Sequence, residues 1–232
     1  MDALVDELLG ELNCETVFTI PLFGGIPINE SIVVTWIMMA AVLLICLLLT
    51  RNLKVNDPGK GQLAREGAVQ WLYNFFDNIM HGEGRQYYFY LMSVMVYIGM
   101  ANLIGIIGFK PPTKDINVTA ALSLMSIILI QVSGWRKKGA RGYFKSYAQP
   151  IAIIAPLNVL ELAIKPLSLC MRLFGNVLGS FVIMELLKQI VPVVVPVVFS
   201  LYFDVFDGLI QAYVFVFLTA LFMCESMEEI ED

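Results

Sequence analysis

The stretch "KPLSLCMRLFGNVLGS" at residues 165–180 places Arg172 in the middle of a long apolar run that extends over roughly residues 151–188. A guanidinium keeps its proton at any accessible pH, and a charge inside a membrane span is unfavourable unless it faces protein or water. Arg172 also lies too far from the ends of the run for its side chain to reach the membrane surface easily. We therefore interpret it as a buried functional cation, with a structurally paired side chain as the alternative.

The composition is that of an integral membrane protein. Of the 232 residues, 58% are hydrophobic and only 15% are charged, and the mean hydropathy is +0.75. The formal net charge is −5, and acidic residues gather at the two ends of the chain. No basic face remains that could bind nucleic acid, so we exclude nucleic acid as a partner.

The sequence predicts neither a metal site nor a cofactor. Its four cysteines show no CxxC spacing, and the single His81 cannot complete a zinc site of the usual nitrogen and sulfur ligands. It contains no P-loop, Rossmann fingerprint or nucleophile motif. We therefore expect the isolated chain not to be an enzyme.

Apolar runs and charged loops divide the chain into six parts. Residues 31–50 supply about 20 apolar positions, enough to cross one hydrocarbon core. The segment "AVQWLYNFFDNIMHG" at residues 68–82 places aromatic residues beside polar ones, as in a helix that lies on the membrane surface. The predicted parts are an outer N-terminal segment (1–30), a first span (31–50), an inner loop with the interfacial helix (51–86), a transmembrane hairpin (87–135), an inner basic loop (136–150), and two long ion-path helices with an inner C-terminal tail (151–232).

The distribution of Lys and Arg predicts an orientation. Five such residues lie in residues 51–86 and five in 136–150, but only Lys110 and Lys114 lie in the loop between them. By the positive-inside rule, the N-terminus is outside and the C-terminus is cytoplasmic. The predicted fold is an all-α integral membrane protein with five transmembrane helices and one amphipathic interfacial helix. A helix over 151–188 is too long for a perpendicular crossing, so we expect the last two helices to be tilted or bent.

Polar residues form one face on each of the last two helices. Steps of three or four residues join them on both helices, which is the spacing of a single helix face. The first face comprises Glu161, Lys165, Ser168, Arg172 and Asn176; the second comprises Ser200, Asp204, Asp207 and Gln211. Two polar faces on adjacent helices indicate one buried polar path.

Two of these positions have a structural alternative. Glu161 and Lys165, four residues apart, could neutralise each other near the inner membrane surface. Asn176 could form a hydrogen bond between helices.

The same residues carry a resemblance to a known family. "KPLSLCMRLFGNVLGS" resembles the signature of subunit a of the F-type ATP synthase, "LIQAYVFVFLTALFM" resembles the last helix of that family, and "KDINVTAALSL" is similar to the start of its third span. The resemblance implies a bacterial inner-membrane subunit with two ion half-channels, which carry H⁺ or Na⁺ to and from a rotating ring of c subunits. The implied partners are this ring, the subunit b peripheral stalk and the lipid bilayer.

The resemblance also implies residue roles. The essential arginine corresponds to Arg172, its neighbouring asparagine to Asn176, and the last-helix glutamine to Gln211. Ser168, Lys165 and Glu161 are expected on the inner side of the path.

The sequence departs from the family pattern at one position. Many members carry an acidic residue nine positions after the arginine, and this chain has Phe181 there, with Glu185 one turn further on. Asp204 occupies the position that often holds a histidine or an acid, seven residues before Gln211, and Asp207 follows it. We therefore expect Glu185, Asp204 and Asp207 to line the outer ion path, with acids at the membrane rim as the alternative.

Two other functions compete with this interpretation. The first is a stand-alone ion channel or secondary transporter, but the sequence shows neither an inverted repeat nor a matching pair of broken helices. The second is a membrane scaffold, for which buried charges would be unfavourable and without purpose.

The predicted orientation can be tested with Cys14. In sealed right-side-out vesicles, a membrane-impermeant thiol reagent should label Cys14, because the N-terminal segment is expected outside. Labelling that occurs only in inverted vesicles would reverse the orientation.

Overall fold

The computed structural model describes residues 16–20, 26–51, 53–54, 59–107, 109–147, 155–190 and 194–228. Cys14 and residues 229–232 of the predicted C-terminal tail lie outside this part. Five of its helices are long and apolar enough to cross a membrane: Glu30–Thr50, Arg85–Ile106, Ile116–Gly139, Pro156–Lys188 and Val198–Met227. This confirms the predicted all-α membrane architecture with five spans.

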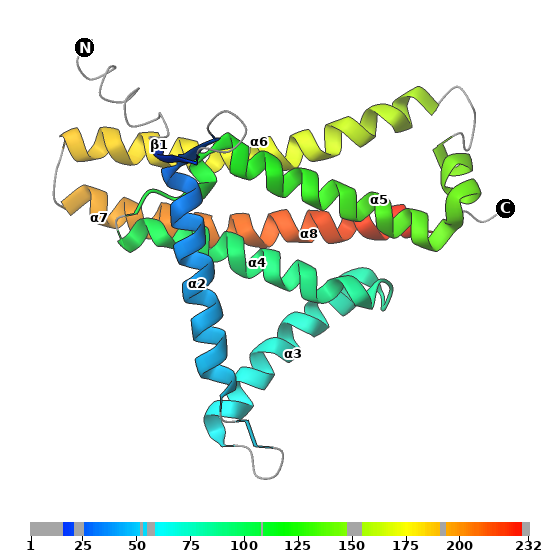
Figure 1. Ribbon diagram of the computed structural model, residues 1–232, viewed down its shortest axis with the longest axis horizontal. Coiled ribbons are helices and arrows are strands. Elements are labelled where there is room, and N and C mark those ends of the chain that lie inside the picture. Colours follow the sequence, from blue (N-terminus) through cyan, green and yellow to red (C-terminus); the bar gives the residue numbers. More distant parts are fainter. Residues whose placement is uncertain are drawn as a thin grey trace. The chain divides into compact units, whose positions relative to one another are not determined.

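Figure 1 shows a chain made mainly of α-helices, which are joined by short 3₁₀ turns and loops. The α-helices are α2 (Glu30–Thr50), α3 (Lys60–Met80), α4 (Tyr88–Leu103), α5 (Ile116–Tyr147), α6 (Ala155–Ile190), α7 (Val194–Ser200) and α8 (Gly208–Met227). Three 3₁₀ turns are η1 (Arg85–Tyr87), η2 (Ile104–Ile107) and η3 (Pro112–Lys114), and η5 (Leu201–Asp207) is a π-helix between α7 and α8.

Two elements differ from the sequence-based expectation. Residues 1–30 were assigned only to an outer N-terminal segment, and within them β1 (Thr16–Ile20) and β2 (Ile26–Asn29) pair as an antiparallel hairpin. β-Branched and aromatic residues in β1 favour a strand. Helix α5 continues to Tyr147, through the range assigned to the inner basic loop, with a break in helical geometry at Gly139. A glycine adopts the positive φ of 70° found there without strain.

Helix α3 corresponds to the predicted amphipathic helix. It is not among the five candidate spans, and it exposes Leu63, Val69 and Trp71 while it buries Phe76 and Met80. Large exposed apolar side chains on a helix of this kind suit the membrane interface. Its location on the membrane surface stays a prediction.

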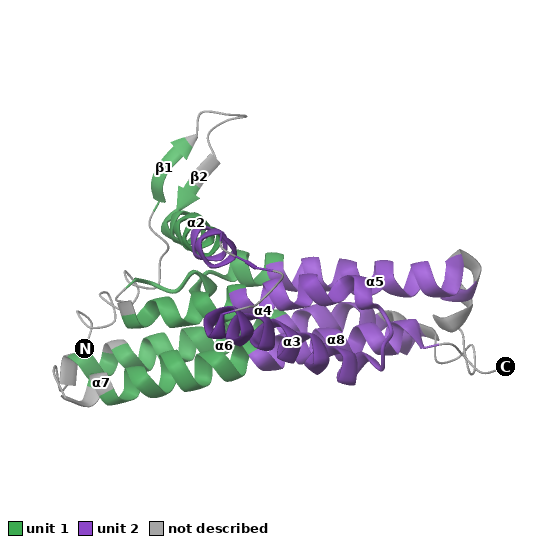
Figure 2. Ribbon diagram, turned by 90° about the horizontal axis from the view of Figure 1, so that it is seen from below, with its two compact units in different colours: residues 1–43, 97–121, 170–212 green, residues 44–96, 122–169, 213–232 purple. Residues whose placement is uncertain are grey.

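The chain forms two compact units, which Figure 2 colours separately. The first contains residues 1–43, 97–121 and 170–212. Within it, the second half of α6 lies beside α7 and η5, and Leu173 is fully buried. The Tyr97 hydroxyl lies 3.4 Å from the Thr35 hydroxyl and joins α4 to α2.

The second unit contains residues 44–96, 122–169 and 213–232. Phe76 and Met80 of α3 are fully buried, as is Tyr88 at the start of α4. The hydroxyl of Ser226 on α8 donates a hydrogen bond of 3.2 Å to the carbonyl oxygen of Ile130 on α5. A hydrogen bond between helices is favourable where no water can compete for the polar groups.

The contact between α5 and α8 predicts the effect of one substitution. A Cβ atom at Gly134 would meet the Ser226 side chain and lie 2.9 Å from the Ser226 carbonyl oxygen, so backbone would have to move. Gly134→Ala should destabilise the protein by about 1–3 kcal/mol, as overpacking usually does. Thermal unfolding of the detergent-solubilised chain measures this.

Gly67→Ala in α3 is the matched control, because nothing lies within 4 Å of the new Cβ. Alanine favours a helix by about 1 kcal/mol over glycine, so this variant should melt at the same temperature or higher. Equal melting temperatures for the two variants would contradict the close approach at Gly134.

Candidate functional site

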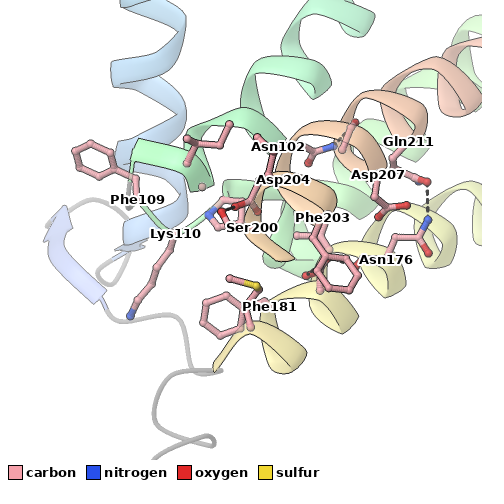
Figure 3. Close-up of a pocket in the computed structure, with 18 of the residues that line it drawn as sticks. Asn102, Phe109, Lys110, Asn176, Phe181, Ser200, Phe203, Asp204, Asp207 and Gln211 are labelled. Atoms are coloured by element: carbon pink, nitrogen blue, oxygen red, sulfur yellow. Dashed lines mark hydrogen bonds between the residues drawn. The ribbon is translucent and has the colours of Figure 1, made fainter. Parts of the chain in front are cut away.

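A cavity of about 660 Å³ lies within the first unit, and it is lined by the end of α4, the second half of α6 and the segment from α7 to α8. Figure 3 shows side chains from all three regions around it. Its polar lining consists of Asn102, Lys110, Asn176, Ser180, Lys188, Ser200, Asp204, Asp207 and Gln211. The structure thus gathers polar groups inside a predominantly apolar protein.

Asp204 and Asp207 line this cavity from the π-helix η5. The Ser200 hydroxyl donates a hydrogen bond of 2.5 Å to Oδ2 of Asp204. Within the part of the chain that the structure describes, Asp207 forms neither a hydrogen bond nor an ion pair. One carboxylate is therefore held by a neighbour, and the other is available to water or an ion.

The close packing of Asp204 depends on a small residue in the 3₁₀ turn η2. A Cβ atom at Gly105 would lie 3.0 Å from Oδ1 of Asp204. Any larger residue at position 105 would therefore crowd the carboxylate.

Asn176 and Gln211 join the two polar faces that the sequence predicts. The Asn176 Nδ2 atom donates a hydrogen bond of 2.6 Å to Oε1 of Gln211, as the dashed line in Figure 3 shows. Gln211 is only 3% exposed, and its Nε2 atom has no hydrogen-bond partner among the described residues. A buried amide donor without a partner is unfavourable, so this group is suited to bind a water molecule in the cavity.

Arg172 lies on α6 one turn before Asn176, and its side chain is partly exposed. None of the ion pairs found among the described residues involves it. Gly175 and Gly179, which follow on the same helix, have open space where a side chain would be. The positive charge is therefore not neutralised by a described carboxylate of its own chain.

Glu185 is the third acid that the sequence predicts for the outer path. Glu185 lies on α6, but its side chain is outside the described part of the structure. Phe181, at the position where the family resemblance implies an acid, lines the cavity. The Nζ atom of Lys114 lies 4.0 Å from the centroid of the Phe181 ring, so a cation–π contact occupies this position.

The residues expected on the inner side belong to the second unit. The Nζ atom of Lys165 lies 3.4 Å from Oε2 of Glu161, as the structural alternative for this pair expects. It also lies 3.0 Å from each carboxylate oxygen of Glu225 on α8. Ser168 is exposed. Lys165 is thus shared by two carboxylates, one of which the sequence analysis did not include.

Several residues at these sites were missed from the sequence. Asn102 and Gly105 carry no motif signal, because each is a single residue in an apolar run. Lys114 opens the stretch "KDINVTAALSL", but its contact with Phe181 was not predicted. Glu225 was counted only as part of the acidic C-terminal end. No group of three His, Cys, Asp or Glu side chains that could hold a metal ion occurs among the described residues.

Comparisons with known proteins identify similar chains. A family model described as ATP synthase A chain matches residues 32–224. A protein named ATP synthase subunit a from Moorella thermoacetica is 38% identical over 201 residues, which cover 86% of this chain and 91% of that protein. ATP synthase subunit a 2 from a Bradyrhizobium species is 33% identical over 205 residues, with 86% and 89% covered. ATP synthase subunit a 1 from Hahella chejuensis is 31% identical over 207 residues, with 89% and 87% covered.

Proposed function

The chain belongs to the ATP synthase A chain family, subunit a of the F-type ATP synthase, and we propose that its Arg172 separates two half-channels that serve a rotating ring of c subunits. As a member of this family, the chain is a multi-pass membrane protein and an ion-translocating subunit of the membrane sector. It is not a catalytic subunit of the complex. The half-channels, the ring contacts and the role of each residue are the proposal.

The observation that carries the proposal is the unpaired charge of Arg172. A guanidinium inside a membrane-crossing helix is unfavourable without a partner, and no described carboxylate of this chain pairs with it. The open space at Gly175 and Gly179 on the same helix leaves room for the close approach of another helix. Both features support a carboxylate supplied by the ring.

The charge of Arg172 explains how an ion is released. A ring carboxylate that passes through lipid must be neutral, with H⁺ or Na⁺ bound, because a bare charge there is unfavourable by several kcal/mol. Close to the guanidinium the anionic form is favoured, and the carboxylate gives up its ion. Arginine does not deprotonate, so it cannot pass a proton on, and it blocks a direct path between the two half-channels.

We assign the outer half-channel to the cavity of the first unit. Asp204 and Asp207 would collect ions from outside, with Glu185 as the third predicted acid. Asn176 and Gln211 would then pass the ion, or its water, to the ring at the depth of Arg172. The hydrogen bond between these two amides and the partnerless Gln211 Nε2 atom support this order.

We assign the inner half-channel to the side of α6 that carries Glu161, Lys165 and Ser168. The pairing of Lys165 with Glu225 adds a fourth residue to this set. The N-terminus would be outside and the C-terminus cytoplasmic, as the distribution of Lys and Arg indicates. The subunit b stalk would hold the chain still while the ring turns. Each elementary charge that moves down 100 mV yields about 2.3 kcal/mol, so several ions must pass for each ATP.

The alternative is a stand-alone channel or transporter. Such a protein would need its own partner for Arg172, and the described residues supply none. Purification of the chain with a ring of small, carboxylate-bearing two-helix subunits would decide between the two.

Arg172→Ala should abolish ion-driven ATP synthesis, because no charge would then promote ion release from the ring. The chain should still insert and assemble, since the substitution removes a charge from an apolar helix. ATP synthesis in sealed vesicles measures the loss, and a native gel of the complex controls for assembly. Normal synthesis by an assembled Arg172→Ala complex would refute the proposal.

The outer path can be tested separately with Glu185→Gln, Asp204→Asn and Asp207→Asn, singly and combined. We expect ion-driven synthesis to fall most in the combined variant, while ATP hydrolysis in detergent, which is uncoupled from ion flow, should remain. Ser180→Ala is the matched control, because Ser180 lines the same cavity and donates its hydrogen bond only to its own helix. If every acid variant kept full coupled transport, the outer path would run elsewhere, and only the assignment of Arg172 would survive.

A further inference from the structure

The π-helix η5 is an irregularity inside the last predicted span, and it carries both described cavity acids. At its end, the N–H of Gly208 donates to the carbonyl of Phe203, five residues back, as well as to that of Val205. A π turn is wider than an α turn, is rarely stable by itself and often occurs at functional sites. Its persistence over Leu201–Asp207 therefore requires support from neighbouring residues.

Asn102 on α4 provides such support at the junction of η5 and α8. Its Nδ2 atom donates a buried hydrogen bond of 2.9 Å to the carbonyl oxygen of Gly208. A Cβ atom at Gly208 would lie 2.8 Å from the Asn102 Cβ. Only glycine therefore allows the asparagine to reach the helix backbone at this point.

Thr113 in the turn η3 forms the second hydrogen bond of the Asn102 amide. Its Oγ1 atom donates a hydrogen bond of 3.0 Å to Oδ1 of Asn102, and Asn102 is only 5% exposed. A backbone carbonyl can only accept, so the amide nitrogen must face Gly208. The amide is thus held between two elements in a single orientation.

We propose that Asn102 is a positioning residue for ion transport, which holds η5 in its π geometry and so keeps Asp204 and Asp207 on the cavity wall. This inference rests on the proposed outer half-channel. If η5 changed to α geometry, the chain before it would rotate relative to α8 by on the order of 100°, the angle of one α-helical residue. Asp204, in the middle of η5, would then turn away from its place beside Gly105.

The packing around η5 is consistent with this role. The 3₁₀ turn η2 packs against η5, and Asp204 fits beside Gly105 of that turn. From η5, Leu201 and Phe203 also line the cavity, whereas Tyr202 and Phe206 do not; Leu201, Tyr202 and Phe206 are all exposed. Positions 201 and 203 are therefore the ones at which access through the cavity reports the geometry of η5.

The test uses the intact complex in vesicles, with the native cysteines replaced. Single cysteines are introduced as Leu201→Cys, Tyr202→Cys, Phe203→Cys or Phe206→Cys, and each is labelled with a water-soluble thiol reagent. Asn102→Leu keeps the branched shape of the side chain but has no hydrogen-bonding atoms. Thr113→Val is the matched control, because it removes one hydrogen bond of the same amide and leaves the bond to Gly208 in place.

With Asn102 present, cysteines at positions 201 and 203 should react faster than cysteines at positions 202 and 206, because the water-soluble reagent reaches the first two through the cavity. In Asn102→Leu the rate at position 203 should fall about fivefold or more, the factor that corresponds to one lost hydrogen bond. The dependence of ion flow on outer pH should shift as well. Thr113→Val should keep both the labelling pattern and the pH dependence.

An unchanged labelling pattern in assembled Asn102→Leu would overturn the inference. If that variant does not assemble, Gly208→Ala gives the same test, because its methyl group pushes Asn102 away from the helix backbone. An unchanged labelling pattern in Gly208→Ala would also overturn the inference. A changed pattern with unchanged ion flow would instead refute the outer half-channel, while the positioning by Asn102 would stand. The two failures are therefore distinguishable.

Discussion

A permanent positive charge inside an apolar helix is the constraint on which this protein depends. Arg172 cannot lose its proton, and burying it without a partner is unfavourable. A helix that carries such a charge is stable in the membrane only if it faces water, protein or an opposite charge. The described part of the chain offers Arg172 no carboxylate, and the glycines beside it leave its helix face open. Both features support our proposal that another subunit supplies the opposite charge.

The polar network around the cavity follows from the same constraint. Because lipid offers no hydrogen bonds, polar groups on the last two helices must find partners inside the protein. Asn176 binds Gln211, Ser200 binds Asp204, and Asn102 binds the backbone at Gly208. The groups left without a described partner, the Gln211 amide nitrogen and the Asp207 carboxylate, border the cavity that we propose to conduct ions.

Hydropathy and charge were sufficient to predict the five spans and to single out Arg172, because lipid strongly restricts where apolar runs and charges can lie. Periodicity also placed Asn176 and Gln211 on facing helices, and the structure joins them by a hydrogen bond. The π-helix could not be predicted, since its support comes from Asn102, which is 106 residues away from Gly208. The hairpin of β1 and β2 is too short to show a period, and Glu225 meets Lys165 across 60 residues.

The central claim is that Arg172 blocks ion flow between two half-channels unless the ring turns. The most direct test locks the ring to this chain with an engineered cross-link and measures passive ion flow through the membrane sector in vesicles. The native chain should then pass no ions, whereas Arg172→Ala should pass them, because one ring carboxylate could exchange its ion with both half-channels. The claim would be contradicted if the locked Arg172→Ala sector passed no ions either, or if the locked native sector passed ions.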